Sequence, residues 1–379
     1  MFDGLIAVLN VGKDSVVSIT NSTIRKLVPF GYTALSAITA GAGSVVNLTE
    51  VVFNKLSPFP DSSFGSEYNW DVPAISGTNA RLNAYKTIFD LYGTSQVGGA
   101  LKWAGGIANI VSSTIAGPSL SISGAPNSGG GIDTGVLNLV NSIVRPAGST
   151  SYARIQAFAG GVANVIASTV QFDALDSTIP NSRLCPGLYP CNGAPLQVFA
   201  DGMINLQSSA VSVINEALAG IQFPYSGAYD TQTGAPLAGI FTADQYSYIQ
   251  PVTNQNAANL EILFQQPNLI TAGVAYTLDA IRNPPFVTYF GLPGGASPNP
   301  SGPLVGVIPD ADTVNRLINP INGSVITSDV FGNPRTTYGL RDVGAVQLAA
   351  PVPGPLPLLG IGAAYGWSRR LRRRLRSCG

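Results

Sequence analysis

The sequence predicts an all-β fold, a right-handed parallel β-helix, from three observations. First, one ten-residue motif occurs six times along the chain. Second, successive copies start 29, 62, 29, 26 and 41 residues apart, as expected of a solenoid in which loops enlarge some coils and the longest interval holds two. Third, the motif is rich in Val, Ile and Thr and alternates locally as a strand does. The right hand follows from the general preference for right-handed crossovers.

The motif begins with Gly or Ser, has an aliphatic fifth position and ends on an apolar residue. Its copies start at Ser15, Ser44, Gly106, Gly135, Gly161 and Gly202. The fourth position is Asn in five copies, with Ser18 as the exception: Asn47, Asn109, Asn138, Asn164 and Asn205. The eighth position is Ser in five copies, with Val51 as the exception: Ser22, Ser113, Ser142, Ser168 and Ser209. Stacked coils would therefore align two polar columns.

Stacking places identical motif positions about 4.8 Å apart, one above another. We expect the Asn and Ser columns to form ladders on a buried stack, in which each amide or hydroxyl bonds its neighbour. Contact with a ligand is the alternative role for these residues. The second position is also apolar, although strict alternation directs it outward. Either a loop covers that face, or the inward and outward assignments are shifted by one residue.

Residues 1–348 are expected to form the solenoid body, and residues 349–379 a tail with a Pro-rich linker, an apolar segment and an Arg-rich end. Loop excursions interrupt the body at about 56–96, 171–195 and 215–303. In the first excursion we predict a short helix from Ala80 to Tyr92 and room for one degenerate coil. The third is interpreted as weak coils with a long loop, or as a separate small domain.

Charge and composition argue against several functional classes. Charged residues make up 11% of the chain, and the formal net charge is zero. Six of the 20 basic residues are arginines in the last eleven positions, so the body carries 14 basic against 20 acidic residues. This acidic body argues against nucleic-acid binding, which requires a basic surface.

The chain has no His, which removes the commonest general base and the commonest zinc ligand. No cofactor is expected.

Two of the three cysteines, Cys185 and Cys191, bracket a turn-prone segment with the sequence Pro-Gly-Leu-Tyr-Pro. A disulfide that closes this small loop is the preferred interpretation and fits an oxidising compartment. Free thiols are the alternative. A metal site is poorly supported, because only two sulfurs lie close together and no His is present.

Several stretches resemble a known family. Residues 98–115 and 129–144 carry a Gly-Gly element before a strand with Asn and Ser, and they look like coils of the bacterial surface β-helices termed choice-of-anchor Q proteins. Residues 329–335 and 341–345 resemble the closing element of that family (Asp, Gly, Arg, then Asp-Ile-Gly-Ala). The family usually has Glu two residues after the Ala, where this chain has Gln347. The resemblance covers most of residues 1–348 and implies fold more than role.

The tail resembles a PEP-CTERM sorting signal. It consists of a Pro-rich element, an apolar run and an arginine cluster, in that order: Val352, Pro353, Gly354 and Pro355; Leu358, Leu359 and Trp367; Arg369, Arg370, Arg372, Arg373 and Arg374. Gly354 replaces the usual Glu. The resemblance implies a secreted protein of a Gram-negative-type bacterium that makes exopolysaccharide. Its tail would be held transiently in the inner membrane and cleaved by an exosortase.

The physical character of the tail agrees in part with this resemblance. The apolar run of residues 356–367 is shorter than the roughly 20 residues that an ordinary spanning helix needs. A short apolar helix followed by arginines on the cytoplasmic side suits a transient stop. The alternative is a terminal peptide whose basic patch contacts anionic lipid. Because the first ten residues lack the pattern of an export signal, we expect the exported protein to begin upstream of Met1.

These observations lead to one functional hypothesis and one alternative. The hypothesis is an exported structural or adhesive protein of the cell surface or extracellular matrix that associates with glycan or exopolysaccharide. The alternative is a polysaccharide lyase or glycoside hydrolase on the same scaffold, which requires converging carboxylates and a cation. The candidates for such a site do not fall into one column, and none is assigned as catalytic: Lys102, Asp133, Arg154, Asp173, Asp176 and Asp201.

Overall fold

The computed structural model describes the chain in separate ranges: 9–25, 36–54, 73–90, 99–116, 119–145, 155–172, 196–199, 201–213, 221–222, 239–249, 298, 302–309, 316–335 and 340–348. Within them all regular structure is β, which confirms the all-β prediction. Backbone contacts divide the chain into Met1–Leu348 and Ala349–Gly379. The second unit, with the predicted helix and sorting signal, lies outside the described residues, as does the Cys185–Cys191 loop.

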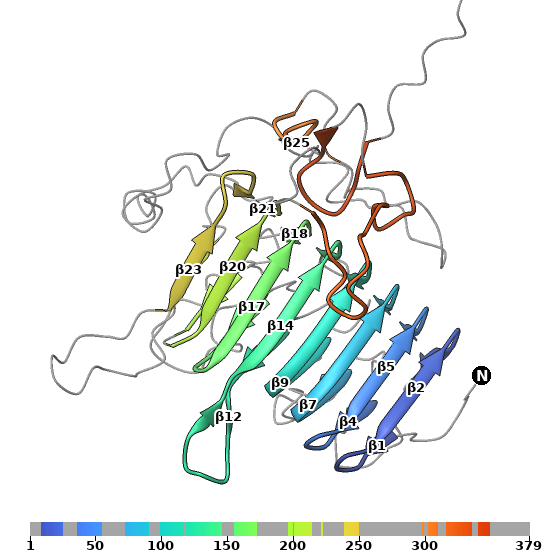
Figure 1. Cartoon of the computed structure of the whole chain (residues 1–379), viewed down its shortest axis with the longest axis vertical. Helices are drawn as coiled ribbons and strands as arrows, with labels where there is room; N and C mark the ends of the chain where they lie inside the picture. Colours follow the sequence, from blue (N-terminus) through green and yellow to red (C-terminus); the bar gives the residue numbers. More distant parts are fainter. Residues whose placement is uncertain are drawn as a thin grey trace, which may run out of the picture. The chain divides into compact units, whose positions relative to one another are not determined.

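The described body is a β-helix-like solenoid of eight coils, each with three short strand segments that form faces A, B and C (Figure 1). Face A consists of β1 (Leu9–Val11), β4 (Ile38–Ala40), the first halves of β7 (Ile75–Tyr85) and β9 (Leu101–Val111), β11 (Leu120–Ser123), β16 (Ile155–Ala157), β19 (Leu196–Val198) and β22 (Ile221–Gln222). Every strand on this face pairs in parallel with the next coil.

Faces B and C continue each coil. Face B consists of β2 (Val16–Thr20), β5 (Val45–Thr49), the second halves of β7 and β9, β14 (Gly135–Val140), β17 (Gly161–Ile166), β20 (Met203–Gln207) and β23 (Ile240–Ala243). Face C consists of β3 (Thr23–Arg25), β6 (Val52–Asn54), β8 (Ile88–Asp90), β10 (Thr114–Ala116), β15 (Ile143–Arg145), β18 (Thr169–Phe172), β21 (Ala210–Val213) and β24 (Tyr248–Ile249). Because β7 and β9 run through both A and B, those faces form one 14-stranded sheet, and C is a separate 8-stranded sheet.

The third coil corrects the predicted helix from Ala80 to Tyr92. Residues 80–90 form the second half of β7, in parallel register with β5 and β9, and then β8, in register with β6 and β10, while residues 91 and 92 lie outside the described ranges. Leu82 and Ala84 point into the core, and Asn83 between them occupies the Asn column. The helix prediction was wrong because Asn79 and Lys86 have positive φ values of 48° and 50°, which turn the chain at the two corners beside the second half of β7 and do not occur within a right-handed helix. The interval between Ser44 and Gly106 therefore holds two coils.

The eighth coil lies inside the predicted excursion at 215–303. β23 pairs with β20, so Thr242 lies beside Asn205 in the Asn column. One extra residue then precedes β24, and Ser247 takes the place of the motif Ser: its hydroxyl accepts the Ser209 N–H at 3.3 Å. The weak coil expected in this region is therefore present, with a different residue type and an altered spacing.

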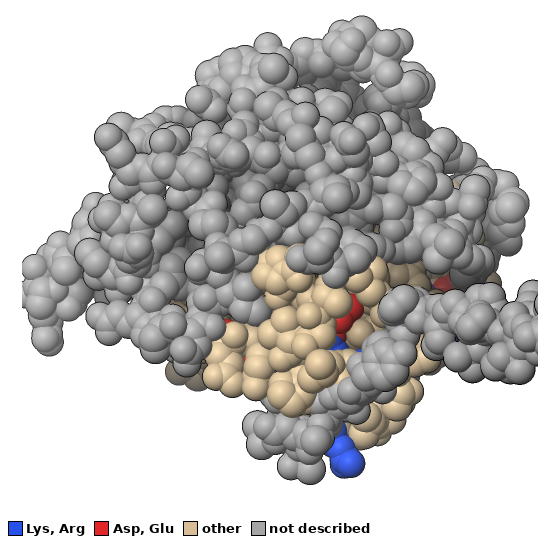
Figure 2. Space-filling view, turned by 90° about the horizontal axis from the view of Figure 1, so that it is seen from above, with Lys and Arg blue, Asp and Glu red and all other residues tan. Residues whose placement is uncertain are grey.

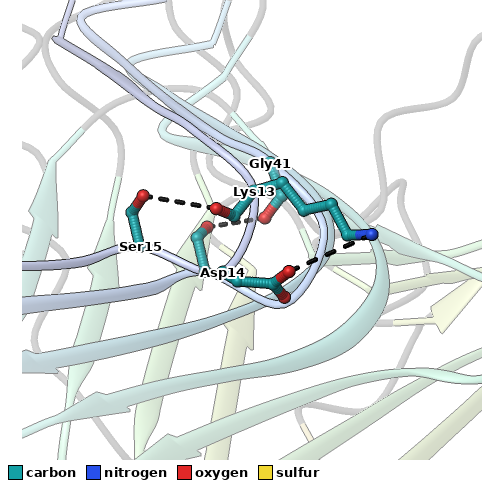
Figure 3. A network of polar contacts seen from close by, with 5 residues as sticks. Lys13, Asp14, Ser15 and Gly41 are labelled. Atoms are coloured by element: carbon teal, nitrogen blue, oxygen red, sulfur yellow. Dashed lines mark hydrogen bonds and ion pairs between the residues drawn. The ribbon is translucent and has the colours of Figure 1, made fainter.

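Two corners in most coils are compact turns built on residues with left-handed backbone. At the corner between faces A and B these are Asp14, Gly43, Asn79, Gly105, Gly160 and Asp201. At the corner between faces B and C they are Asn21, Glu50, Lys86, Ser112, Asn141, Ala167 and Ser208. Figure 3 shows the first such turn, where the Ser15 hydroxyl donates to the Lys13 carbonyl at 3.3 Å and Lys13 pairs with Asp14 at 4.0 Å.

The third corner, from face C to face A of the next coil, takes up most of the variation in coil length. The connections there run from 117–119, the shortest, to 173–195, the longest of those between consecutive coils. The corner between A and B is enlarged twice, once by the hairpin of β12 (Ala125–Pro126) and β13 (Ile132–Asp133) and once before β23. Irregular spacing in the sequence therefore coexists with a regular stack.

The Asn ladder is continuous but lies on the outward side of face B, which corrects the expected buried stack. Each Asn Nδ2 donates to the Oδ1 of the preceding coil at 2.9 Å from Asn83 to Asn205, and Asn47 donates to the Ser18 hydroxyl. The alternation is strict: the second position points outward as well and stays partly exposed, from Val16 to Met203. The inward positions are the third and fifth.

The Ser ladder is buried, but it runs through the backbone and not from hydroxyl to hydroxyl as expected. The hydroxyl of Ser142 accepts the N–H of Ser113 at 3.1 Å and donates to its own coil's Val140 carbonyl at 2.8 Å. Ser113, Ser168 and Ser209 repeat both contacts. Each Ser therefore satisfies a corner N–H that is buried between coils.

The core is one column of aliphatic side chains from all three faces, and its buried aromatic residues belong to three successive coils. Phe53 and Phe89 stack at 4.9 Å between ring centroids in neighbouring coils of face C. Trp103 fills the level above Gly77, its partner in register, where an added Cβ would lie 2.3 Å from the indole ring. Glycine at position 77 therefore makes room for the largest buried side chain of the body.

The first motif position is Gly in later coils because another backbone passes close to it. A Cβ at Gly161 would lie 2.4 Å from the carbonyl oxygen of Ile122, and one at Gly135 would lie 2.0 Å from that of Ser123. A Cβ at Gly202 would likewise lie 2.3 Å from the carbonyl oxygen of Ala157. A backbone oxygen cannot move aside as a flexible side chain can, so any larger residue strains the corner.

We predict that Gly161→Ala lowers the free energy of unfolding by about 1–3 kcal/mol, the usual cost of forcing one methyl group into a packed site. Gly129→Ala is the matched control, since its Cβ would meet nothing closer than 3.5 Å. Urea unfolding followed by circular dichroism measures both variants. Equal midpoints for the two variants would contradict the close approach at the corner.

Candidate functional site

The closing segment (residues 302–309, 316–335 and 340–348) covers the outward side of face C. Ile143 of β15 is buried together with Ala345 and Val346. Ala210 and Tyr248, two and three coils further on, are buried with Leu304, Ile308 and Val343. Burial raises the pKa of the Tyr248 phenol to about 12. Face C is therefore lined by packed apolar groups along coils five to eight and is unsuited to a soluble ligand there.

The same segment also covers one edge of face B. Leu317 packs on Val111 and Val140, outward residues of β9 and β14 that are buried by this contact, and Ile321 and Ile326 join the cluster. Figure 1 shows this part of the closing segment at the ends of the face B strands. The Asn ladder runs beside the covered edge, and Asn109 is only 2% exposed. We therefore assign the Asn column a structural role in register.

One buried arginine joins the closing segment to the coils. The Arg335 guanidinium donates to the side-chain oxygen of Asn141, to the Ala167 carbonyl at 3.1 Å and to the Gly344 carbonyl at 2.7 Å. Asn141 and Ala167 are the left-handed corner residues of coils five and six. Burial lowers the pKa of Arg335 to about 10, while Asp329 and Asp342 oppose this and Arg341 adds to it. The residue therefore stays charged at neutral pH.

Two buried carboxylates hold the closing segment in shape. Asp329 accepts the N–H groups of Phe331, Asn333 and Gln347 at 2.8–3.0 Å. Asp342 accepts those of Gly306 and Leu348, both at 2.7 Å. Burial raises the pKa of Asp342, and its backbone donors and Arg335 oppose the rise.

The hydrogen bonds of Gln347 explain why an amide and not a carboxylate stands at this position. Its Oε1 accepts the Asp342 N–H at 3.0 Å, while its own N–H donates to Asp329. A Glu at this place would add a third carboxylate among buried acids, whereas the neutral amide keeps the same acceptor. The residues singled out as a closing element, 329–335 and 341–345, thus form a polar cluster against the solenoid wall.

The apolar clusters of the described closing segment lie on faces B and C, whereas face A carries a polar strip along the coil axis. Its first column is Asn10, Thr39, Ser76, Lys102, Ser121, Gln156 and Gln197, and its second is Gly12, Gly41, Thr78, Ala104, Ser123, Phe158 and Phe199. We call these two columns the polar strip. Exposure falls along the first column, from the exposed Lys102 through Ser121 and Gln156 to the buried Gln197.

Hydrogen bonds link part of the polar strip. The Ser121 hydroxyl donates to Gln156 Oε1 at 3.0 Å, and Gln156 Nε2 donates to Gln197 Oε1 at 2.7 Å. Beside them, the rings of Phe158 and Phe199 stack at 4.3 Å between centroids, with 16° between their planes. The bonded amides and the stacked rings therefore follow each other along the same two coils of face A.

Electrostatically the polar strip is nearly neutral. Neither column contains an acid, and Lys102 is its one cation. In the view of Figure 2, most of the atoms that are not grey belong to uncharged residues. Such a surface offers hydroxyl and amide groups at the spacing of the coils. It suits an extended, hydroxyl-rich ligand better than a compact charged one.

The candidates for a catalytic site are not gathered into one. Lys102 is exposed on face A, Asp133 accepts the Asn127 side chain in the β12–β13 hairpin, and Asp201 is an exposed corner residue. No ion pair among the described residues joins these three. The remaining candidates, Arg154, Asp173 and Asp176, lie outside the described ranges. Over those ranges no group of three His, Cys, Asp or Glu side chains has an arrangement fit for a metal ion.

Sequence reasoning missed the paired Gln and Phe of the polar strip, although a signal was present. Gln-Ala-Phe-Ala-Gly-Gly at 156–161 recurs as Gln-Val-Phe-Ala-Asp-Gly at 197–202, and each segment ends on the first residue of a motif copy.

Comparison with known proteins adds no relative, since no family model, curated protein or solved structure matches the chain. No helix in the described ranges has the length and apolar character needed to cross a membrane.

We predict that Arg335→Met lowers the free energy of unfolding by about 3–5 kcal/mol. The buried oxygen atoms that accept its hydrogen bonds would lose their donor, and the buried carboxylates of Asp329 and Asp342 would lose the nearby cation. Arg81→Met, at an exposed site on face B, is the control and should change stability by less than about 0.5 kcal/mol. Urea unfolding gives both values, and limited proteolysis should cut Arg335→Met first within residues 316–348. An Arg335→Met variant as stable as Arg81→Met would show that Arg335 does not hold the closing segment to the coils.

Proposed function

We propose that this chain is an exported bacterial protein of the cell surface or extracellular matrix, structural or adhesive in role, that binds extended polysaccharide along face A. The body would be a right-handed parallel β-helix. The observation that carries the proposal is the bonded row of Ser121, Gln156 and Gln197, flanked by Phe158 and Phe199. This row runs along the coil axis from the partly exposed Ser121 and Gln156 to the buried Gln197, on a different face from those that the apolar clusters of the described closing segment occupy.

The chemistry of the row matches that of a sugar chain. A polysaccharide presents hydroxyl groups at regular intervals, and each can donate and accept. Gln156 has one Nε2 hydrogen and one Oε1 lone pair left after its two ladder bonds, and a partly exposed amide can offer both to a ligand. The ladder bonds also hold the amide in place, which reduces the entropy lost on binding. Phe158 and Phe199 add apolar surface beside it, which can pack against the C–H groups of sugar rings.

Export and sorting rest on the tail and the cysteines. In this proposal the arginines at 369–374 stop transfer through the inner membrane, and an exosortase-type enzyme cleaves near Val352–Pro355. A disulfide between Cys185 and Cys191 would form after export, in an oxidising compartment. Export would bring the body into contact with polysaccharide, and cleavage of the tail would set the mature C-terminus.

We predict that the full chain is retained by a glycan array of long polysaccharides and that Gln156→Leu weakens its binding roughly three- to tenfold, the value of one or two hydrogen bonds. Gln207→Leu, an exposed glutamine on face B, is the matched control and should bind as the parent does. Biolayer interferometry on the retained glycan measures the three proteins.

A product assay on the same glycan distinguishes the alternative. Binding without new chain ends is the expected result. New reducing or unsaturated ends would favour a hydrolase or lyase, and equal losses in both variants would show that face A is not the binding surface.

A further inference from the structure

We infer that the polar strip selects acidic polysaccharides and that Lys102 is the residue that recognises their carboxylate groups. The inference rests on the proposed function and names its ligand class. Lys102 lies in register between Ser76 and Ser121, in the middle of the first column of face A. The residues beside it in the second column are Thr78, Ala104 and Ser123, all small, so the ammonium group has room for a ligand.

Lys102 differs from the other two lysines of the described ranges. Lys13 pairs with Asp14 at 4.0 Å, and Lys86 pairs with Glu50 at 3.5 Å and lies over the Tyr85 ring. No acid within the described part of the chain pairs with Lys102, which is exposed on face A. An exposed ammonium without a carboxylate partner, in a row of hydroxyls and amides, is suited to bind the carboxylate of a ligand.

The position of Lys102 also sets how the ligand lies. With a uronate carboxylate on Lys102, the sugar chain can run along the axis over Ser121 to Gln156, both of which present neutral hydrogen-bonding groups. One cation in the strip implies one carboxylate bound per chain, with the neighbouring sugars held by hydroxyl contacts. The strip contains no acid, so the ligand meets no like charge within it.

The net charge of the body works against this ligand at long range. Outside the last eleven residues the chain carries 14 basic and 20 acidic residues, so a polyanion is repelled overall. At physiological salt that repulsion is screened beyond about 8 Å, while a direct ammonium–carboxylate contact persists. Preference for an acidic chain would therefore come from Lys102 and not from the general field of the protein.

The test compares two forms of one polymer, polygalacturonate and its methyl ester, in which a methyl group on each carboxyl removes the negative charge. We expect the full chain to bind polygalacturonate about three- to fivefold more tightly at 150 mM salt, the contribution of one exposed ion pair. Lys102→Ala should bind both forms equally, Lys102→Arg should keep the preference, and Lys86→Ala should behave as the parent.

Three results would overturn the inference. Equal binding of both polymers by the parent, unchanged in Lys102→Ala, would leave the proposed glycan binding intact and remove the acidic selectivity. An equal loss of preference in Lys86→Ala would assign it to overall charge. Binding of neither polymer by the parent would contradict the proposed function together with the inference.

Discussion

The body depends on register between coils. Because side chains alternate between core and solvent, a slip of one residue would bring the Asn column into the core and turn Leu137 and Leu139 outward. The ladder amides bond at 2.9 Å only when equal motif positions align, so the slip would also leave them unpaired among aliphatic groups. Left-handed corners and close-packed glycines are compatible with that one alignment.

This constraint explains where the chain varies. Length differences accumulate mainly at the corner after face C, where no ladder must be continued, while the other two corners keep a left-handed residue in nearly every coil. The closing segment uses the same regularity. Arg335 bonds equivalent corner positions in two successive coils, and the Gly344 N–H donates to Ser208 of the next. The apolar clusters of that segment lie on faces B and C, whereas the polar strip lies on face A.

Much of the fold was predictable because the aligned positions keep their residue types. The sequence allowed for a degenerate third coil and a weak eighth coil but did not place their strands. In the third, Arg81 and Lys86 occupy outward or corner places, which the core does not constrain, and in the eighth Thr242 replaces Asn beside an extra residue. The place of Arg335 could not be predicted, since its partner Asn141 is 194 residues away and no local pattern encodes that contact. The strip lies before the motif, outside the positions that repeat in every coil.

The most direct test of this account is hydroxyl-radical footprinting of the full chain with and without saturating polysaccharide, read by mass spectrometry. Phe158 and Phe199 report on face A, and Met203, a partly exposed outward residue of β20, reports on face B. The account predicts that the polysaccharide protects both phenylalanines from oxidation and leaves Met203 unchanged. Protection of Met203 with unchanged phenylalanines would contradict it, because the ligand would then lie on the face of the Asn ladder.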